Sequence, residues 1–189
     1  MIPKYASIFQ LDDKHWYQFL NKLEEKTIKK NDFFLIKNEI CNYLGVVESG
    51  SLRTYYIDNL GNEVSFLFFL DNDCFTDYES IITDSPSNFY IQALEDSKIH
   101  LIHKKDLFML YKSEIFWENF GRRMVERIFL TTKKRMEELL FLTPVNRYLQ
   151  LLKVNPLILQ KVPQKFIASY LGIKPQSLSR IRKRISYLK

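Results

Sequence analysis

The hydrophobic pattern of this chain changes its period near Leu107. Up to about Asp106, short runs of aromatic and β-branched residues alternate with polar ones, and turn residues such as Glu48-Ser49-Gly50 and 58–62 separate the runs. From Leu107 onward the apolar residues recur every three or four positions, which is the period of an α-helix. This order predicts an α+β protein with a small antiparallel barrel or sandwich first and helices afterwards.

A separate helix is expected ahead of the strands. Trp16, Phe19, Leu20 and Leu23 lie at helical spacing, and the pattern ends near Asn31-Asp32. The sequence therefore predicts a helix over much of the first thirty residues.

A long helix is predicted from about Glu114 to Phe141. No proline interrupts this segment, and the next proline is Pro144. At roughly 28 residues it would be about 42 Å long, too long for a small domain to cover on every side. Its apolar stripe, Phe120, Met124 and Ile128, belongs either to the core or to a seam with a second copy of the chain. The heptad-like spacing favours the seam, and we expect these three residues to lie in a homodimer interface.

Charge is distributed unevenly along the chain. The 28 basic and 22 acidic residues give a net charge of +6, but the segment 143–189 holds ten of the basic residues and no Asp or Glu. The remainder, with 28 − 10 = 18 basic and 22 acidic residues, has a net charge of −4. A basic module at one end of an otherwise acidic chain indicates a polyanionic partner.

That module contains the segment QKFIASYLGIKPQSLSRIRK, which has the residue types of a helix-turn-helix. Ala168 supplies a small side chain where two helices cross, and Gly172 can adopt the positive φ of a tight turn. Apolar residues at set offsets would seal the crossing: Ile167, Leu171, Ile173, Leu178 and Ile181. The alternative, two ordinary amphipathic helices, leaves the absence of acidic residues unexplained.

The second helix of this motif is expected to start at Pro175, a residue suited to a first turn. Its outward face would then carry Gln176, which can pair with adenine, and Arg180, which can pair with guanine in the major groove. We expect the remaining polar residues to contact phosphates and position the helix: Lys165, Lys174, Ser177, Ser179, Arg182, Lys183 and Arg184.

Residues from about 146 to 185, and VPQKFIASYLGIKPQSLSRIRKRI in particular, resemble the carboxy-terminal DNA-binding domain of the Crp/Fnr family of bacterial transcription regulators. The order of the whole chain is similar too: a cyclic-nucleotide-binding-like β-roll sensor, a long dimerisation helix and a (winged) helix-turn-helix. The resemblance implies a homodimer on a near-palindromic site in double-stranded DNA, with RNA polymerase as a further partner. The family's base-contacting positions fall on Pro175, Gln176 and Arg180, and Pro175 departs from the basic residue found there in the best-known members.

This resemblance divides the chain into a β-roll sensor domain at 1–112, a dimerisation helix at 113–141 and a helix-turn-helix domain at 142–189. The segment NPLILQKVP is expected to be a short extended link, and any wing strand to lie around 157–162.

The sensor departs from the family's phosphate-binding cassette, which supplies a Gly-Glu pair and later an Arg followed by a small hydroxyl residue. Thr76-Asp77 stand where Gly-Glu would be, Pro86-Ser87-Asn88 stand near the Arg position, and no arginine occurs between Thr54 and Gly121. A buried phosphate without a cation is unfavourable, so we expect no cyclic AMP binding in the family's usual way. The corresponding pocket would be lined by Phe66, Phe68, Phe75, Thr76, Asp77, Tyr78, Pro86, Ser87 and Phe89.

Three alternatives for the sensor stay open: an unknown small-molecule effector, a pocket filled by its own aromatic side chains, and a cyclic-nucleotide response. Two cysteines, Cys41 and Cys74, are too few for an iron–sulfur cluster. The histidines His15, His100 and His103 are isolated, and the last two should point to opposite faces of a strand. We therefore expect no metal and no cofactor, haem included.

Two other functions remain as rivals. A cupin-like enzyme with a basic helical appendage would need a cluster of catalytic residues, and none can be assembled from the sequence, so we expect no enzyme. A module acting on RNA is disfavoured by the helix-turn-helix spacing and by the lack of stacking aromatics on its outer face. The longest apolar run, VSFLFFL, is too short for a membrane span, and a cytoplasmic protein without membrane contact is expected.

Overall fold

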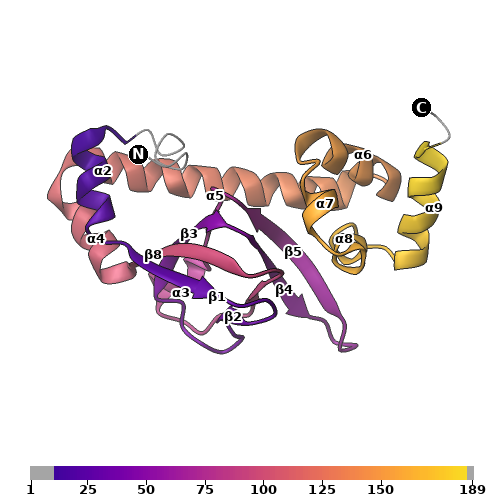
Figure 1. The fold of residues 1–189 in the computed structure, drawn as a ribbon, viewed down its shortest axis with the longest axis horizontal. Helices are drawn as coiled ribbons and strands as arrows, with labels where there is room; N and C mark the ends of the chain where they lie inside the picture. Colours follow the sequence, from indigo (N-terminus) through magenta and orange to yellow (C-terminus); the bar gives the residue numbers. More distant parts are fainter. Residues whose placement is uncertain (1–10, 187–189) are drawn as a thin grey trace. The chain divides into compact units, whose positions relative to one another are not determined.

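The computed structural model describes residues 11–186, which form eight strands and eight helices in the order shown in Figure 1. The strands are β1 (Glu24–Ile28), β2 (Phe33–Leu35), β3 (Tyr43–Ser49), β4 (Ser51–Ile57), β5 (Glu63–Leu70), β6 (Cys74–Phe75), β7 (Tyr90–Ala93) and β8 (Ser97–His103). The helices are α2 (Asp13–Leu20), α3 (Tyr78–Thr83), α4 (Lys104–Ser113), α5 (Ile115–Phe141), α6 (Pro144–Val154), α7 (Ile158–Lys161), α8 (Gln164–Tyr170) and α9 (Pro175–Ser186). Strands precede the long helices, as the change of period predicted.

The strands make two four-stranded sheets, ordered β1-β8-β3-β6 and β2-β7-β4-β5. Strand β8 is central to the first sheet and pairs antiparallel with both β1 and β3. Since neighbouring sheet positions belong to strands far apart in sequence, the sheets form a roll rather than a simple meander.

Two apolar clusters hold this part of the chain together because side chains alternate across the first sheet. Val47 and Ile99 face the interior between the sheets and join one cluster with Leu52 and Ile91 of the second sheet. Val46 and Ile102 face the other way and join a second cluster with residues of α2, α4 and the start of α5. The three helices therefore cover the outer face of the first sheet.

The N-terminal helix is shorter than its sequence predicted. Helix α2 begins after the N-cap Asp12 and ends at Leu20, and residues 24–28 form β1 instead of continuing the helix. All five β1 residues lie opposite β8 in antiparallel register. Long-range pairing with β8 thus outweighs the local helical spacing of this charged segment.

The two turns predicted from sequence are confirmed. Gly50 joins β3 to β4 with φ +120°, and a Cβ there would approach the Ser97 side chain to 2.3 Å, so the position requires glycine. In the second turn the Asp58 carboxylate accepts hydrogen bonds from the backbone N–H groups of Leu60 and Asn62, which closes the hairpin between β4 and β5.

Helix α5 spans 27 residues, close to the predicted length. Pro144 occupies the first turn of α6, and Thr143 caps that helix by accepting a hydrogen bond from the N–H of Asn146. The segment expected to be an extended link or a wing strand is the short helix α7, in which Ile158 is buried. Turn hydrogen bonds from the N–H groups of Ile158 and Leu159 to Asn155 and Pro156 start this helix.

The chain divides into two compact units. One comprises Met1–Arg53 and Phe69–Glu126, and the other comprises Thr54–Phe68 and Arg127–Lys189. The second unit therefore holds the β4–β5 hairpin tip together with the C-terminal helices. Within residues 11–186, no helix combines the length with the hydrophobicity that a membrane span requires.

Candidate nucleic-acid interface

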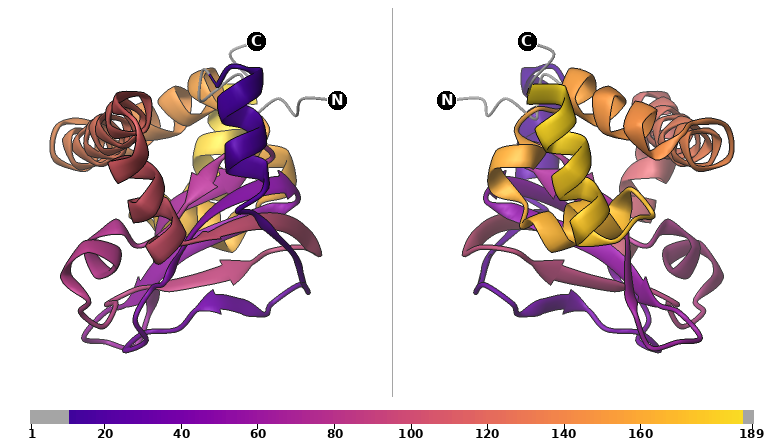
Figure 2. Two further views of the ribbon diagram at one scale, coloured as in Figure 1. Left: turned by 90° about the vertical axis from the view of Figure 1, so that its left-hand side faces the viewer. Right: turned by 90° about the vertical axis from the view of Figure 1, so that its right-hand side faces the viewer.

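Helices α8 and α9 pack against each other around a tight turn (Figure 2). The N–H of Gly172 donates to the carbonyl of Ser169, and the N–H of Ile173 donates to the carbonyl of Ala168, which together make a Schellman motif. Gly172 adopts φ +67°, and a Cβ there would lie 3.7 Å from Nη2 of Arg147, which is an ordinary contact distance. Glycine is therefore needed for its backbone conformation, as the sequence predicted, and not for lack of room.

Helix α9 begins at Pro175 and buries one face, on which Leu178 is 1% exposed. Ala168, the small residue predicted at the helix crossing, is fully buried. Gln176 and Arg180, the predicted base readers, are both exposed on the opposite face. The structure thus presents α9 with the polarity that recognition in a groove needs.

The predicted phosphate contacts surround that face. Ser177 is half-buried, while the others are exposed: Lys165, Lys174, Ser179, Arg182, Lys183 and Arg184. The Lys165 ammonium also lies 4.6 Å from the centre of the Phe166 ring. Because the sequence from Thr143 onward contains no carboxylate side chain, nothing acidic in this segment opposes a polyanion.

Arg147 supports the base of the helix-turn-helix, a role that its sequence position did not reveal. Its guanidinium donates to the carbonyl of Leu171 at 3.0 Å, at the end of α8, and to the carbonyl of Leu142 at 2.8 Å, beyond the end of α5. Leu171 and Leu142 directly follow the last residues of α8 and α5, so one cation binds at two helix C-termini.

A second unpredicted support joins α5, α8 and the β5 hairpin within one compact unit. Arg135 is 4% exposed, lies 3.6 Å from the centre of the Tyr170 ring and donates to the Tyr170 carbonyl. Ser169 accepts a hydrogen bond from the N–H of Ser65 and donates one to the carbonyl of Glu63. Burial lowers the pKa of Arg135 and raises the pKa of the Tyr170 hydroxyl. Helix α8 is thus fastened on two sides.

Two of the three residues predicted for the seam of α5, Phe120 and Met124, require correction. Phe120 and Met124 are 2% and 7% exposed and belong to the apolar cluster that contains Trp16 and Leu107 of the same protomer. Ile128 is half-buried. Helical spacing identifies an apolar face but not what covers it, and here α2 and α4 cover the face carrying Phe120 and Met124.

Another face of α5 is both apolar and exposed. Val125, Phe129, Thr132, Met136 and Leu139 follow one another at alternating intervals of four and three residues. The exposed fractions of Phe129 and Met136 are 63% and 54%. This is the spacing of a coiled-coil seam, so the heptad signal is present on α5, shifted from the predicted residues.

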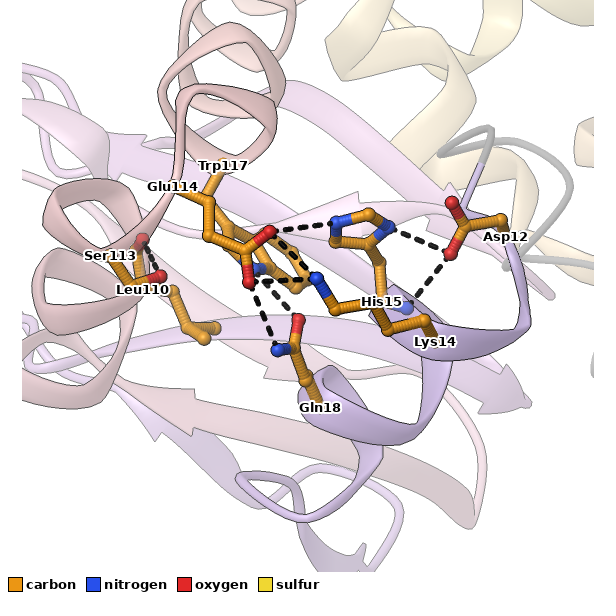
Figure 3. Close-up of polar contacts among 8 residues, drawn as sticks. All are labelled: Asp12, Lys14, His15, Gln18, Leu110, Ser113, Glu114 and Trp117. Atoms are coloured by element: carbon orange, nitrogen blue, oxygen red, sulfur yellow. Dashed lines mark hydrogen bonds and ion pairs between the residues drawn. The ribbon is translucent and has the colours of Figure 1, made fainter.

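A polar clamp fixes the beginning of α5 (Figure 3). Glu114, at the break between α4 and α5, binds the Lys14 ammonium at 2.9 Å and accepts from the Gln18 amide at 3.3 Å. Gln18 in turn accepts from the Trp117 indole N–H, and His15 lies between Asp12 at 2.7 Å and Glu114 at 3.5 Å. The hydrogen bond from Lys14 is the main cause that lowers the pKa of Glu114.

In the sensor region the structure brings three other predicted residues close to Asp77: Thr76, Ser87 and Phe89. Asp77 caps α3 by accepting from the Ser80 N–H, and its other carboxylate oxygen accepts from the Ser87 hydroxyl at 2.5 Å. Ser87 also accepts from the Phe89 N–H, and the neighbouring Thr76 donates to the Tyr43 carbonyl. The cassette position therefore already holds an internal anion with its own donors.

The other predicted pocket residues do not gather there. Phe75 is a core residue whose ring lies against Gly45, and Pro86 is exposed. Phe68 packs 5.3 Å from the Tyr170 ring of α8. The Tyr78 hydroxyl interacts with Tyr111, and burial raises the pKa of Tyr78. Phe66 is half-buried.

The roll contains a buried cation, Arg53, which directly precedes the segment without arginine that begins at Thr54. Arg53 on β4 is 1% exposed, and its guanidinium donates to the Gln92 side-chain oxygen on β7 at 2.8 and 3.2 Å. The cassette residues themselves still include no arginine, because Arg53 lies on β4 and hydrogen-bonds to Gln92 on β7.

Comparisons with known proteins agree with this architecture. Residues 25–114 match the sequence model of the cyclic nucleotide-binding domain family, whereas no curated protein matches the chain by sequence. FixK2 from Bradyrhizobium japonicum has a similar structure, with a TM-score of 0.77 at 16% identity, over 88% of this chain and 85% of that chain. A protein from Eubacterium rectale, described as a transcriptional regulator of the Crp/Fnr family, gives 0.72 at 20% identity, over 94% and 85% of the two chains. The chain has the Crp/Fnr fold.

A mutant of CooA from Carboxydothermus hydrogenoformans shares this Crp/Fnr fold over 100% of the present chain and 86% of its own, with a TM-score of 0.71 at 18% identity. In this fold, the roll is the cyclic nucleotide-binding-like domain and α8 and α9 are the helix-turn-helix.

Proposed function

We propose that the protein is a homodimeric transcription regulator that binds a near-palindromic site in double-stranded DNA through α9. The observation that carries this proposal is the exposed face of α9, where Gln176 and Arg180 stand on a helix-turn-helix without a nearby acidic residue in sequence. Arg147 and the Arg135–Tyr170 contact hold α8, and α8 positions α9. A rigid support of this kind favours defined contacts with base edges.

The dimer is proposed to form through the exposed heptad face of α5. Phe129 and Met136 would interdigitate with the same residues of a second copy, as the a and d positions of a coiled coil do. A symmetric dimer presents two copies of α9 to two half-sites about one DNA turn apart, which explains why the site should be near-palindromic. RNA polymerase remains the further partner expected of such a regulator.

DNA binding itself is tested by the salt dependence of affinity for mixed-sequence duplex DNA, measured by fluorescence anisotropy on the full chain. Because α9 would neutralise phosphates, affinity should fall steeply with salt, and Arg182→Ala should reduce the slope by about 1. Lys105→Ala is the matched control, since Lys105 is equally exposed but lies on α4. Equal slopes for all three proteins, or stronger binding to single-stranded RNA, would contradict the proposal.

We further propose that the roll does not bind cyclic AMP in the family's usual way. The Asp77 carboxylate stands at the start of α3 and is hydrogen bonded to Ser87, so it would repel an incoming phosphate. An unknown small-molecule effector, or regulation by protein level alone, would then control activity. Isothermal titration calorimetry with cyclic AMP at micromolar concentration should give no saturable heat, and saturation would establish the cyclic-nucleotide-responsive alternative instead.

A further inference from the structure

Three adjacent strands of the first sheet bring metal-ligating side chains to one spot. Glu25 on β1 lies directly opposite His100 on β8. Glu48 comes from β3, the other neighbour of β8, and its carboxylate lies 2.6 Å from Nε2 of His100. One potential ligand atom from each of these three side chains lies within 4.8 Å of the other two.

A β-bulge places Glu48 in this cluster. Val47 pairs with Ile99 and Ser49 pairs with Lys98, so Glu48 is the additional residue of β3 between two consecutive positions of β8. A bulge turns the inserted side chain out of the regular alternation, and bulges are frequent beside functional sites. The pairing explains why the sequence alone predicted no metal site, since the three ligands are far apart along the chain.

The spot already binds a cation that belongs to the protein. The Lys98 ammonium lies 3.0 Å from the Glu25 carboxylate and 3.2 Å from the Glu48 carboxylate. Lys98 and His100 are two residues apart on β8 and so share a face. Burial alone would raise the pKa of Glu48, but hydrogen bonds from His100 and Lys98 outweigh it and keep the pKa below its ordinary value. Both carboxylates thus already form an ion pair with one positive charge.

We propose that Glu25, Glu48 and His100 form a conditional binding site for a divalent transition-metal ion such as Zn²⁺, which displaces the Lys98 ammonium when it binds. Imidazole nitrogen with carboxylate oxygen suits Zn²⁺ and its neighbours, whereas Mg²⁺ and Ca²⁺ prefer oxygen ligands only. Two carboxylates balance the two charges of the ion. The His100 side chain is 12% exposed and anchored on the central strand, while the Lys98 side chain, at 38%, has room to leave.

Metal binding would link β1 to β3 across β8 and so brace the edge of the sheet that follows α2. Because the Lys98 ammonium must leave before the ion can enter, Lys98 raises the metal concentration that is needed to fill the site.

The test measures metal binding to the tag-free full chain by calorimetry with Zn²⁺ and by the visible absorption of bound Co²⁺. The wild-type protein should bind one ion per chain, and His100→Gln should weaken binding by at least about tenfold. Lys98→Met should tighten binding by about tenfold, because it removes a cation that competes at close range. His103→Gln is the matched control: His103 ends the same strand but caps α4, and its loss should leave affinity unchanged.

Circular dichroism verifies that each variant is folded, and Glu25→Gln, at an exposed position, replaces His100→Gln should that variant unfold. Two results would overturn the proposal. One is the absence of saturable binding in both the wild-type protein and Lys98→Met. The other is binding that survives His100→Gln or Glu25→Gln undiminished, because the ion would then be held elsewhere, for example at Cys74.

Discussion

Replacing Phe129 by Asp should dissociate the dimer without unfolding the protomer. Complete burial of a Phe side chain contributes about 1.5–3 kcal/mol. Since 63% of Phe129 is still exposed in the protomer, its burial in a seam would add about 1–2 kcal/mol per copy, or about 2–4 kcal/mol for two copies. Loss of that contribution raises the dimer dissociation constant roughly 30-fold to 1,000-fold, and the buried carboxylates of the variant add to it.

The assay is sedimentation equilibrium, accompanied by thermal unfolding. Two control variants separate an effect on the seam from an effect of charge or of the protomer's own core. Lys134→Asp places the same charge on the opposite face of α5 and should leave the dimer intact. Met124→Asp should instead lower the unfolding temperature, since Met124 lies in the protomer's own core. A Phe129→Asp protein that remains a dimer as tight as the wild type would refute the proposed seam, and so would a Met124→Asp protein that is fully folded but monomeric.

Three further predictions concern the turn, the recognition helix and the clamp at α5. Gly172→Ala should destabilise the protein by about 1–2 kcal/mol in denaturant unfolding, because a side chain disfavours the φ of +67°; an unchanged midpoint would show that the turn tolerates a Cβ. Arg180→Ala should lose about 1–3 kcal/mol of discrimination at one base pair of each half-site, whereas a uniform loss across sequences would make Arg180 a phosphate contact. The pKa of Glu114 is lowered from 4.5, so the folded state holds this proton less tightly than the unfolded chain, and the stability it confers is present above pH 4.5 and lost as pH falls further. Trp117 fluorescence should report a smaller acid-induced change in Glu114→Gln than in the wild type, and equal changes would contradict the role of the clamp.

Local signals explain why the helix-turn-helix could be predicted residue by residue. Ala168, Gly172 and Pro175 each satisfy a requirement of their own backbone position or of an adjacent crossing, within a dozen residues. The hairpin turns at Gly50 and Asp58 were predictable for the same reason. In each case the sequence neighbours are also the structural neighbours.

Features that depend on distant pairing were predicted poorly. The first three of residues 24–28 are charged, and the segment carries no alternation that would mark a strand, so only pairing with β8 makes it β1. The stripe of Phe120 and Met124 has the same spacing whether a second copy or α2 covers it. Arg135 binds a carbonyl 35 residues away, and one of the carbonyls that Arg147 binds is 24 residues away. A basic residue gives no sign of such a distant partner in its immediate sequence.

Two copies of α9 are proposed to read two half-sites of duplex DNA. The most direct test is selection of bound sequences from a random duplex pool by the wild-type protein, without added ligand, followed by sequencing of the enriched pool. We predict enrichment of an inverted repeat whose half-sites lie about one DNA turn apart. Enrichment of a single asymmetric site, or of no sequence at all, would contradict the account.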